Sequence, residues 1–302
     1  MNISEFSLKY KPLFEKAAQT AGYNGAEYSF ANIFIWRTQI NAQFVTFDDF
    51  PNIVSFSFGE TRFFYPFGGT EEENAVCANE IVENHPYANF GSMGTIVCEK
   101  VKSVFSDRYT YAELREYADY LYDVERLTSV SGKKLHGKRN HINSFMSTFE
   151  DRWGFEEITP QTLHECVEFN KQWLESQTDF SKSLGQEQIA VNECFENFDA
   201  LELVGGMLRL DGKVIGFAIG RPLNGDTFLE MIEKADAEIR GAYPVLLNQF
   251  SKHFCGGYKF VNREDDSGDN GLRKAKLSWY PAEIYMKWRT KPNIKQKKRT
   301  DV

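Results

Sequence analysis

The sequence predicts an α+β protein built from two similar halves. Its 302 residues are enough for two domains of about 150 residues each. The content of 42% hydrophobic and 15% aromatic residues can form a large buried core. Each half shows helical patterns, then three strand-like runs joined by tight turns, then a further helix. We therefore expect domains at residues 1–150 and 151–290, followed by a basic, disordered tail at 291–302.

The N-terminal half begins with helical patterns and continues with short strands. Leu13, Ala17 and Ala21 recur at four-residue spacing, which predicts a helix over 12–21. The remaining elements expected in this half are a helix over 29–37, strands over 44–47, 52–58 and 61–66, and a helix over 71–83. Asp48-Asp49 and Gly59-Glu60 predict tight turns between the strands, so the strands should run antiparallel.

The C-terminal half repeats this order. Asp211-Gly212 and Asn224-Gly225 are strong hairpin signals between apolar runs. The expected elements are helices over 162–176 and 186–198, strands over 202–210, 213–221 and 227–233, a helix over 244–255, a strand over 258–262, a short basic helix and a strand over 283–288. This is the element order of the N-acetyltransferase (GNAT) fold. We predict tandem GNAT-like domains with a cleft between them, each with a mixed, mainly antiparallel sheet flanked by helices; a single α+β domain with a long insertion is the alternative.

Composition excludes several classes of protein. The five cysteines are scattered and show no metal-binding spacing, and the five histidines form no cluster, so neither disulfides nor a metal site is expected. No apolar run approaches the roughly 18 residues of a membrane span, and the first residues do not resemble a signal peptide. We expect a cytoplasmic protein. The net charge is −8, although residues 287–302 hold seven Lys or Arg against one Asp. Such an end is typical of a solvated tail, and it could also contact RNA or an anionic membrane.

Residues 261–281 carry the densest group of charges in the sequence. The segment reads as an apolar strand, an acidic turn and a short basic helix. Either the helix caps itself with its own charges, or the charges serve an anionic ligand. A calcium loop is excluded: Asp266 and Gly271 fit its first and sixth positions, but the twelfth position is Leu277.

Four motifs resemble one family of proteins. They are NREDD at 262–266, GLRKAKLSWYP at 271–281, EKAD at 233–236 with Gly241-Ala242-Tyr243, and GKKLHGKRNHINSF at 132–145. Together they resemble bacterial proteins similar to the cytosolic C-terminal catalytic region of phosphatidylglycerol lysyltransferase. The resemblance implies a tandem GNAT fold related to the Fem-type transferases, which carry amino acids from aminoacyl-tRNA onto peptidoglycan precursors. The implied partners are tRNA and an anionic lipid or cell-wall precursor, and the implied location is the cytoplasm or the membrane surface. The multi-helix membrane part of a lipid lysyltransferase is not in this sequence, so the acceptor stays open.

The donor can be considered from the segment 235–244. In GNAT enzymes that use coenzyme A, the corresponding loop and helix N-terminus bind the pyrophosphate. This chain keeps Arg240 and Gly241 there, but Asp236 and Glu238 would repel a pyrophosphate. The segment therefore favours an aminoacyl donor, whose amine is cationic, over coenzyme A.

Glu233 and Asp236 are the candidate catalytic residues. They lie at the end of an apolar strand and just beyond it, where a carboxylate can hold an ammonium group or take a proton from a nucleophile. The alternative for both residues is a salt bridge with Lys234, Arg240 or Arg263, and the sequence does not favour either role.

The segment 133–149 predicts a helix whose core-facing stripe includes a lysine. Its apolar positions are Leu135, Ile142, Phe145, Met146 and Phe149. Lys138 falls within the same arc of about 100°, so it must extend to solvent, meet an anion, or show that the helix begins later, at Gly137. Lys133, Lys134, Lys138 and Arg139 either form a solvated helix start or, as the resemblance suggests, face the phosphates of tRNA or lipid.

The predicted function is transfer of an aminoacyl group from tRNA to a lipid, cell-wall precursor or other amine or hydroxyl acceptor. A non-catalytic GNAT-fold module that binds a metabolite or an acidic partner is the alternative, and an acetyltransferase comes third. The candidate residues for substrate or anion binding are Lys133, Lys138, Arg139, Asn140, Arg240, Gly241, Tyr243, Asn262, Arg263, Glu264, Arg273, Lys274 and Lys276.

Overall fold

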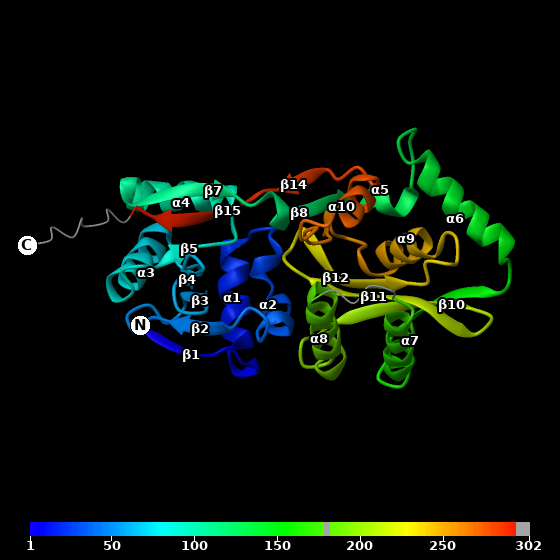
Figure 1. Ribbon diagram of the computed structural model, residues 1–302, viewed down its shortest axis with the longest axis horizontal. Helices are drawn as coiled ribbons and strands as arrows, with labels where there is room; N and C mark the ends of the chain where they lie inside the picture. The colour runs from blue at the N-terminus through cyan, green and yellow to red at the C-terminus, as the bar shows by residue number, and fades with distance from the viewer. Residues whose placement is uncertain (178–181, 294–302) are drawn as a thin grey trace, which may run out of the picture.

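The computed structural model describes residues 1–177 and 182–293 and consists of two lobes side by side (Figure 1). The tail predicted at 291–302 lies mostly outside the described residues. Among those residues, no helix combines the length and the apolar character needed to span a bilayer.

The N-terminal lobe contains a five-stranded sheet in the order β1-β2-β3-β4-β5. Its strands are β1 (Asn2–Glu5), β2 (Ala42–Thr46), β3 (Val54–Phe58), β4 (Arg62–Phe63) and β5 (Asn89–Phe90). Its helices are α1 (Lys11–Ala21), α2 (Phe30–Trp36), α3 (Glu71–Asn84) and α4 (Thr95–Phe105). Ser29 caps α2, and Thr70 with Glu73 forms a capping box on α3, so both helices begin where the sequence supplies a cap.

The C-terminal lobe contains a seven-stranded sheet in the order β14-β8-β13-β12-β11-β10-β9. Its strands are β8 (Asp119–Asp123), β9 (Trp153–Glu157), β10 (Val204–Leu210), β11 (Lys213–Pro222), β12 (Thr227–Ala235), β13 (Phe260–Asn262) and β14 (Glu283–Tyr285). Helices α7 (Leu163–Glu175) and α8 (Lys182–Glu196) cover one face, and α9 (Ala242–Phe254) covers the other (Figure 1). The remaining helices are α5 (Val124–Ser129), α6 (His136–Thr148) and α10 (Asn270–Leu277).

The two lobes repeat one topology. In each, three consecutive antiparallel strands lead through a helix to a parallel neighbour: β4 pairs with β5 across α3, and β12 pairs with β13 across α9. An additional antiparallel strand, β1 or β9, lies beside the first of the three. The predicted class, α+β with tandem GNAT domains and mainly antiparallel sheets, is confirmed.

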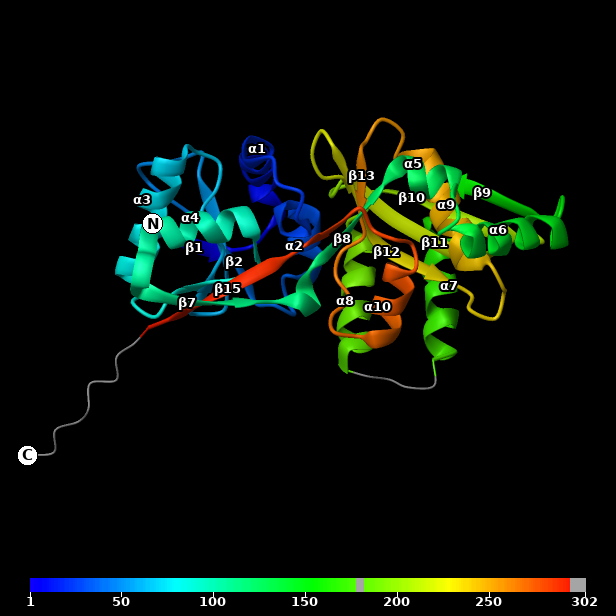
Figure 2. The ribbon, with the colours of Figure 1, turned by 90° about the horizontal axis from the view of Figure 1, so that it is seen from above.

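The lobes exchange their last strands (Figure 2). Strand β8, from the N-terminal half, pairs with β13 and β14 in the C-terminal lobe. In return, β15 (Lys287–Pro292) lies between β6 (Met93–Gly94) and β7 (Tyr109–Glu113) in the N-terminal lobe. The sheets therefore cross the boundary predicted at residue 150, because each lobe is completed by a strand from the other half of the chain.

Several predicted elements differ in extent. The strand predicted at 61–66 is the two-residue β4, and the one at 283–288 is divided between β14 and β15, which lie in different sheets. Helix α8 begins at Lys182, four residues earlier than predicted. The segment 89–130 contributes elements that were not predicted: the four strands β5, β6, β7 and β8 and the two α-helices α4 and α5.

Candidate functional site

Strand β12 presents two glutamates on one face because it contains a bulge. Residues three apart in a regular strand point to opposite faces. Here Ile219 pairs with Ile232, and the next residue, Gly220, pairs with Glu230, so Met231 is an extra residue. The bulge turns Glu230 and Glu233 toward the same neighbour, Arg263.

Arg263 fills the gap in which β12 and β13 separate. The two strands pair only between Thr227–Leu229 and Phe260–Asn262. Just beyond this pairing, Arg263 donates through Nε to Glu230 and through Nη2 to Glu233. The side chains of Glu230, Arg263 and Glu233 are 2%, 9% and 15% exposed. The guanidinium also lies 5.6 Å from the ring centre of Tyr122. The gap is therefore occupied by a nearly dry cluster of two acids and one base.

The contacts of Glu233 bear on its two predicted roles, a catalytic carboxylate or a partner in a salt bridge. Its salt bridge is to Arg263 and not to Lys234, which pairs instead with Glu187 at 2.7 Å and lies 4.0 Å from the ring of Trp173. Burial raises the pKa of Glu233 to about 7 against the opposing attraction of Arg263, and the charge of Glu230 acts in the same direction as burial. A group with such a pKa can exchange a proton near neutral pH.

Lys276 and Glu264 extend this cluster toward α10. Lys276 is buried, and its Nζ donates to the carbonyl oxygens of Arg263, at 2.6 Å, and Asp265. Burial lowers the pKa of Lys276, and the charge of Arg263 lowers it further. Burial likewise raises the pKa of Glu264 to about 8, with the charge of Asp265 acting in the same direction. Glu264 has a φ of 55°, and its buried Oε1 has no hydrogen-bond partner among the described residues. It is a strained acidic residue with an unused acceptor.

Asp266 fastens the turn before α10. It accepts hydrogen bonds from Arg273 at 2.7 and 2.8 Å, from Arg115 at 3.3 Å and from the hydroxyl of Tyr120 at 2.5 Å. Burial alone would raise the pKa of Asp266, but these bonds hold it at about 2. Asp269 caps α10 by accepting from the N–H of Leu272 at 2.6 Å. The helix is thus capped by a side chain of its own segment, and Arg273 is held in an ion pair with Asp266.

Asn262 connects this cluster to the N-terminal lobe. Its Nδ2 donates to Asp119 Oδ2 at 3.0 Å and to the carbonyl oxygen of Asn24 at 2.7 Å. Asp119 accepts from Lys287 Nζ at 2.6 Å, and the same ammonium lies 3.0 Å from Glu27 Oε2. Burial raises the pKa of Glu27 to about 7 in spite of Lys287. Side chains from both lobes and both exchanged strands thus meet in one buried polar cluster.

Lys138 lies at the border of the site, and its neighbours on α6 do not enter it. Its Nζ is 4.9 Å from the ring centre of Trp279, and burial followed by the charge of Arg263 lowers its pKa. This contact accounts for a lysine within the apolar stripe of α6, where Leu135, Ile142 and Phe145 are buried. Arg139 donates to the carbonyl oxygen of Val130 at 2.7 Å, and Asn140 contacts His136 at 3.1 Å. Lys133, Arg240 and Lys274 are exposed outside the cluster.

The N-terminus of α9 is covered by α6. Gly241 has a φ of 95°, and a Cβ there would lie 2.8 Å from the carbonyl oxygen of His141. The N–H of Ala242 donates to Ile239, and Pro244 has no N–H, so few donors are free in the first turn. Tyr243 is half-buried beside this turn. Asp236, the second candidate catalytic residue, accepts from the N–H of Glu238 at 2.9 Å and forms a local turn.

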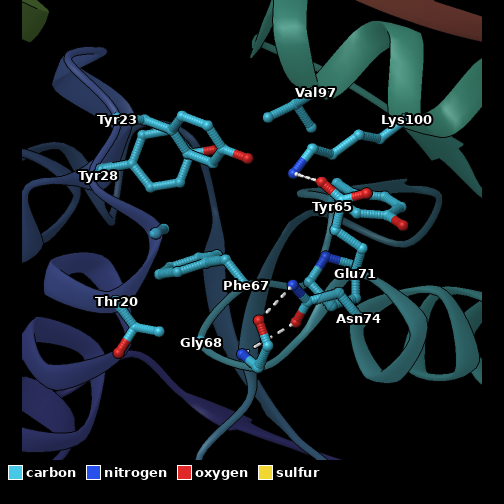
Figure 3. A pocket seen from close by; sticks show the side chains of 13 residues that line it. Thr20, Tyr23, Tyr28, Tyr65, Phe67, Gly68, Glu71, Asn74, Val97 and Lys100 are labelled. Carbon is cyan, nitrogen blue, oxygen red and sulfur yellow. Dashed lines mark hydrogen bonds and ion pairs between the residues drawn. The ribbon is translucent and has the colours of Figure 1, made fainter.

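A cavity of about 100 Å³ lies beside the start of α3 in the N-terminal lobe, the helix that corresponds to α9 (Figure 3). It lies between the loop that precedes α3, the segment that follows α1, and α4. Lys100 Nζ forms an ion pair with Glu71 at 2.5 Å at its edge, facing the rings of Tyr23, Tyr28 and Tyr65. The sequence-based candidates do not line this cavity.

The sequence did not single out Glu230, Asp119, Lys287 or Glu27, all of which belong to the buried cluster. A signal existed for Asp119, an acid directly before the apolar run Tyr120-Leu121-Tyr122. Glu230 could not be predicted because of the bulge: in a regular strand, Glu230 and Glu233 would lie on opposite faces of the sheet. Within the described residues, no group of histidines, cysteines and acids has the arrangement of a metal site.

Comparison with known proteins identifies the family. The family model described as "Phosphatidylglycerol lysyltransferase, C-terminal" matches residues 19–291. A conserved protein of unknown function from Bacteroides thetaiotaomicron is similar in structure, with a TM-score of 0.89, 30% identity, and coverage of 97% of this chain and 99% of that chain. L-PGS from Bacillus licheniformis has the same fold, with a TM-score of 0.67, 14% identity, and coverage of 96% and 93%. FemX has a TM-score of 0.59, with 10% identity and coverage of 96% and 97%.

A curated relative, an uncharacterised protein from Mycoplasmoides gallisepticum, is 26% identical over 175 residues, which are 57% of this chain and 56% of that protein. The chain thus spans little more than half the length of this relative. The family model, in contrast, extends over nearly the whole chain. The chain belongs to the family of the phosphatidylglycerol lysyltransferase C-terminal region.

Proposed function

We propose that this protein transfers an aminoacyl group from aminoacyl-tRNA to an amine or hydroxyl acceptor, such as a lipid or a cell-wall precursor. The observation that carries the proposal is the acidic cluster around Glu233, at the point where β12 and β13 separate and both lobes meet. With a lipid acceptor, the protein works at the cytoplasmic surface of a membrane. Family membership supports the reaction class, and the residues below supply its chemistry.

The reaction requires one proton to move. The acceptor nitrogen or oxygen attacks the ester carbonyl carbon, the bond from that carbon to the ribose oxygen breaks, and the acceptor proton ends on that oxygen. Glu233 takes the proton and passes it on, for which a pKa of about 7 is suitable. Arg263 stays paired with Glu230 while Glu233 is protonated, so the buried cation is not left alone.

The donor is an aminoacyl ester in this proposal because its cationic amine fits the residues present. Its ammonium group suits the buried acids, and Glu264 has an unused acceptor oxygen. The pyrophosphate of coenzyme A would need free N–H groups at the start of α9, where α6 covers Gly241 and Pro244 has no N–H. Asp236 and Glu238 add negative charge at the same place.

The test is transfer of a radiolabelled amino acid from charged tRNA to lipid or cell-wall precursor fractions. We expect the wild-type protein to label one fraction, and Glu233→Gln to lower the rate by about 10²-fold or more, as for loss of a general base. Glu175→Gln is the matched control, since it removes an exposed carboxylate at the end of α7 in the same lobe and should leave the rate unchanged.

Three results would contradict the proposal. Label that stays on tRNA with every fraction, while the wild-type protein is folded, would favour the binding-module alternative. Full activity of a folded Glu233→Gln variant would remove Glu233 from the chemistry. Saturable binding of acetyl-CoA would favour the acetyltransferase.

A further inference from the structure

A second hollow lies on the C-terminal lobe and shares no lining residue with the acidic cluster. Its volume is about 630 Å³, which is within the range of ligand sites. Four distant segments form it: the end of β8 with the start of α5, the loop before α6, the turn before β13, and the residue that follows Trp279. The lining residues are Asp123, Glu125, Arg126, Ser131, Gly132, Lys133, Lys134, Leu135, Tyr258, Lys259 and Tyr280.

The lysines of this hollow have no acidic partners. Among the residues that the structure describes, Lys133, Lys134 and Lys259 form no ion pair, although the chain as a whole carries a net charge of −8. Arg126 makes the hollow's acidic contact, with Asp123 at 3.7 Å. Four cations thus face two acids in one concave surface, and an anion there would meet ammonium groups that are not already neutralised.

An aromatic ring is held in the same hollow by strained backbone. Tyr280 has a φ of 53°, which is uncommon for a bulky side chain. Arg126 Nη1 donates to its carbonyl oxygen at 3.0 Å, and its own N–H donates to Leu277 at 2.9 Å, so the conformation is fixed at both ends. The ring is partly exposed and lies 5.4 Å from Lys134 Nζ, with Tyr258 in the same wall. The turn that ends α10 therefore holds the ring at the hollow, where 40% of Tyr280 is exposed.

We infer that this hollow binds single-stranded RNA, with phosphates at Lys133, Lys134 and Lys259 and a base stacked on Tyr280. Lysines that follow a phosphate backbone and aromatic rings that stack bases are the two components of such sites. The inference rests on the proposed function for the source of the RNA, which is the donor tRNA. The hollow adds a place where the RNA is held outside the acidic cluster, in which polyanionic phosphates would be repelled.

The experiment measures binding of a fluorescent single-stranded RNA of about 12 nucleotides to the full chain between about 50 and 200 mM salt. We expect the double variant Lys133→Gln/Lys134→Gln to bind more weakly, and its slope of log affinity against log salt to fall by about 0.7 for each lost phosphate contact. Tyr280→Ala should weaken binding about tenfold, while Tyr280→Phe should not, because the ring is what stacks.

The controls match charge and ring. Lys171→Gln/Lys213→Gln removes two exposed lysines from the same lobe outside the hollow, and Tyr87→Ala removes an exposed ring from the other lobe. Thermal unfolding of each variant checks that it is folded. Equal weakening of RNA binding by the control and hollow variants would overturn the inference. It would also be overturned if the hollow variants lost binding to phosphatidylglycerol vesicles and kept their RNA affinity, since the hollow would then serve a lipid headgroup.

The failure of this inference differs from failure of the proposed function. RNA binding that depends on the hollow, in a protein that transfers no aminoacyl group, supports the hollow and removes the transferase. Transfer that continues in hollow variants with unchanged RNA affinity removes the hollow and leaves the transferase.

Discussion

Three acids of the buried polar cluster have pKa values far above those of the same groups in water. Burial raises the pKa of Glu27 and Glu233 to about 7 and that of Glu264 to about 8. Each acid also faces a lysine or arginine that favours its charged form, so burial is the stronger effect. Near neutral pH, small changes in the surroundings can therefore add or remove protons here, as acid–base chemistry requires.

The raised pKa of Glu264 can be measured through its effect on the free energy of unfolding. The pKa of Glu264 rises from 4.5 to about 8 on folding, so the folded state binds the proton more tightly. Its contribution is complete below about pH 4.5 and is lost as the pH rises through about 8. Glutamine imitates the protonated acid at every pH. We expect Glu264→Gln and the wild type to be similarly stable at about pH 4.5, and the variant to become more stable by a few kcal/mol at about pH 9, since one pKa unit corresponds to about 1.4 kcal/mol.

Urea unfolding of both proteins across this pH range measures the difference. Glu238→Gln is the control, because its exposed carboxylate should give a difference close to zero at every pH. A difference that stays constant, or that favours the wild type at high pH, would show that Glu264 is charged and paired in the folded protein.

The sequence led to some members of this cluster and not to others. Asn262, Arg263, Glu264 and Lys276 were found because they lie together in one charged motif. Lys287 was not found, because its partners Asp119 and Glu27 are 168 and 260 residues away in the sequence. Even so, its Nζ donates to Asp119 at 2.6 Å. Contacts of this kind depend on which strands meet, and local pattern does not carry that information.

At the scale of elements, the contact of α6 with α9 decides what the start of α9 can bind. Gly241 allows this contact through its positive φ and its missing side chain. We expect Gly241→Ala to destabilise the protein by about 2–4 kcal/mol, from backbone strain and from overpacking against His141 and Phe145. Chemical denaturation measures the loss.

Two other glycines provide controls for that prediction. Gly137, in α6, has open space around its Cβ position, and alanine there should stabilise the helix by about 0.5–1 kcal/mol. Gly256 also has open space, and its substitution by alanine should be close to neutral. A small effect of Gly241→Ala, comparable to these two, would show that α6 can move away from α9.

The elements that the sequence predicted best are those with local signals. Asp211-Gly212 and Asn224-Gly225 fix the hairpins of β10, β11 and β12, and Ser29 and Thr70 mark helix starts. The bulge at Met231 has only an indirect signal, because the glycine that faces it, Gly220, lies in β11 and not in the bulged strand β12. Yet the bulge determines that Glu230 and Glu233 face the same arginine, so the most consequential local irregularity was the least predictable.

At the scale of the whole molecule, the exchange of strands makes the two lobes one structure. Strand β15 is the central strand of its sheet, between β6 and β7, and β8 lies between β13 and β14. At the crossing, Lys287 joins Asp119 and Glu27 in nearly complete burial, where loss of one partner of an ion pair costs about 3–5 kcal/mol. The repeated order of elements was visible in the sequence, but the exchange was not, since each strand could equally have completed its own half.

The exchange leads to a prediction about fragments that divide the chain at the sequence-predicted boundary. Fragment 1–150 lacks the central strand of the β6-β15-β7 sheet and carries β8 without its partners. Fragment 151–302 has the opposite defect. We expect neither fragment alone to unfold cooperatively, because each leaves strand edges and apolar side chains exposed. Expressed together, they should copurify as a one-to-one complex and show the cooperative transition of the intact chain, measured by gel filtration and thermal unfolding.

A rearranged fragment separates this explanation from simple instability of short chains. Residues 1–117 joined through a flexible Gly/Ser linker to residues 286–293 contain every strand of the N-terminal lobe, β15 included, and omit β8. This chain is shorter than fragment 1–150, yet it should fold alone, because its sheets are complete. If fragment 1–150 folded as well as the rearranged chain, the exchanged strands would be accessory to the lobes. The buried cluster of Asp119, Asn262 and Lys287 would then form only after two independently stable domains had docked.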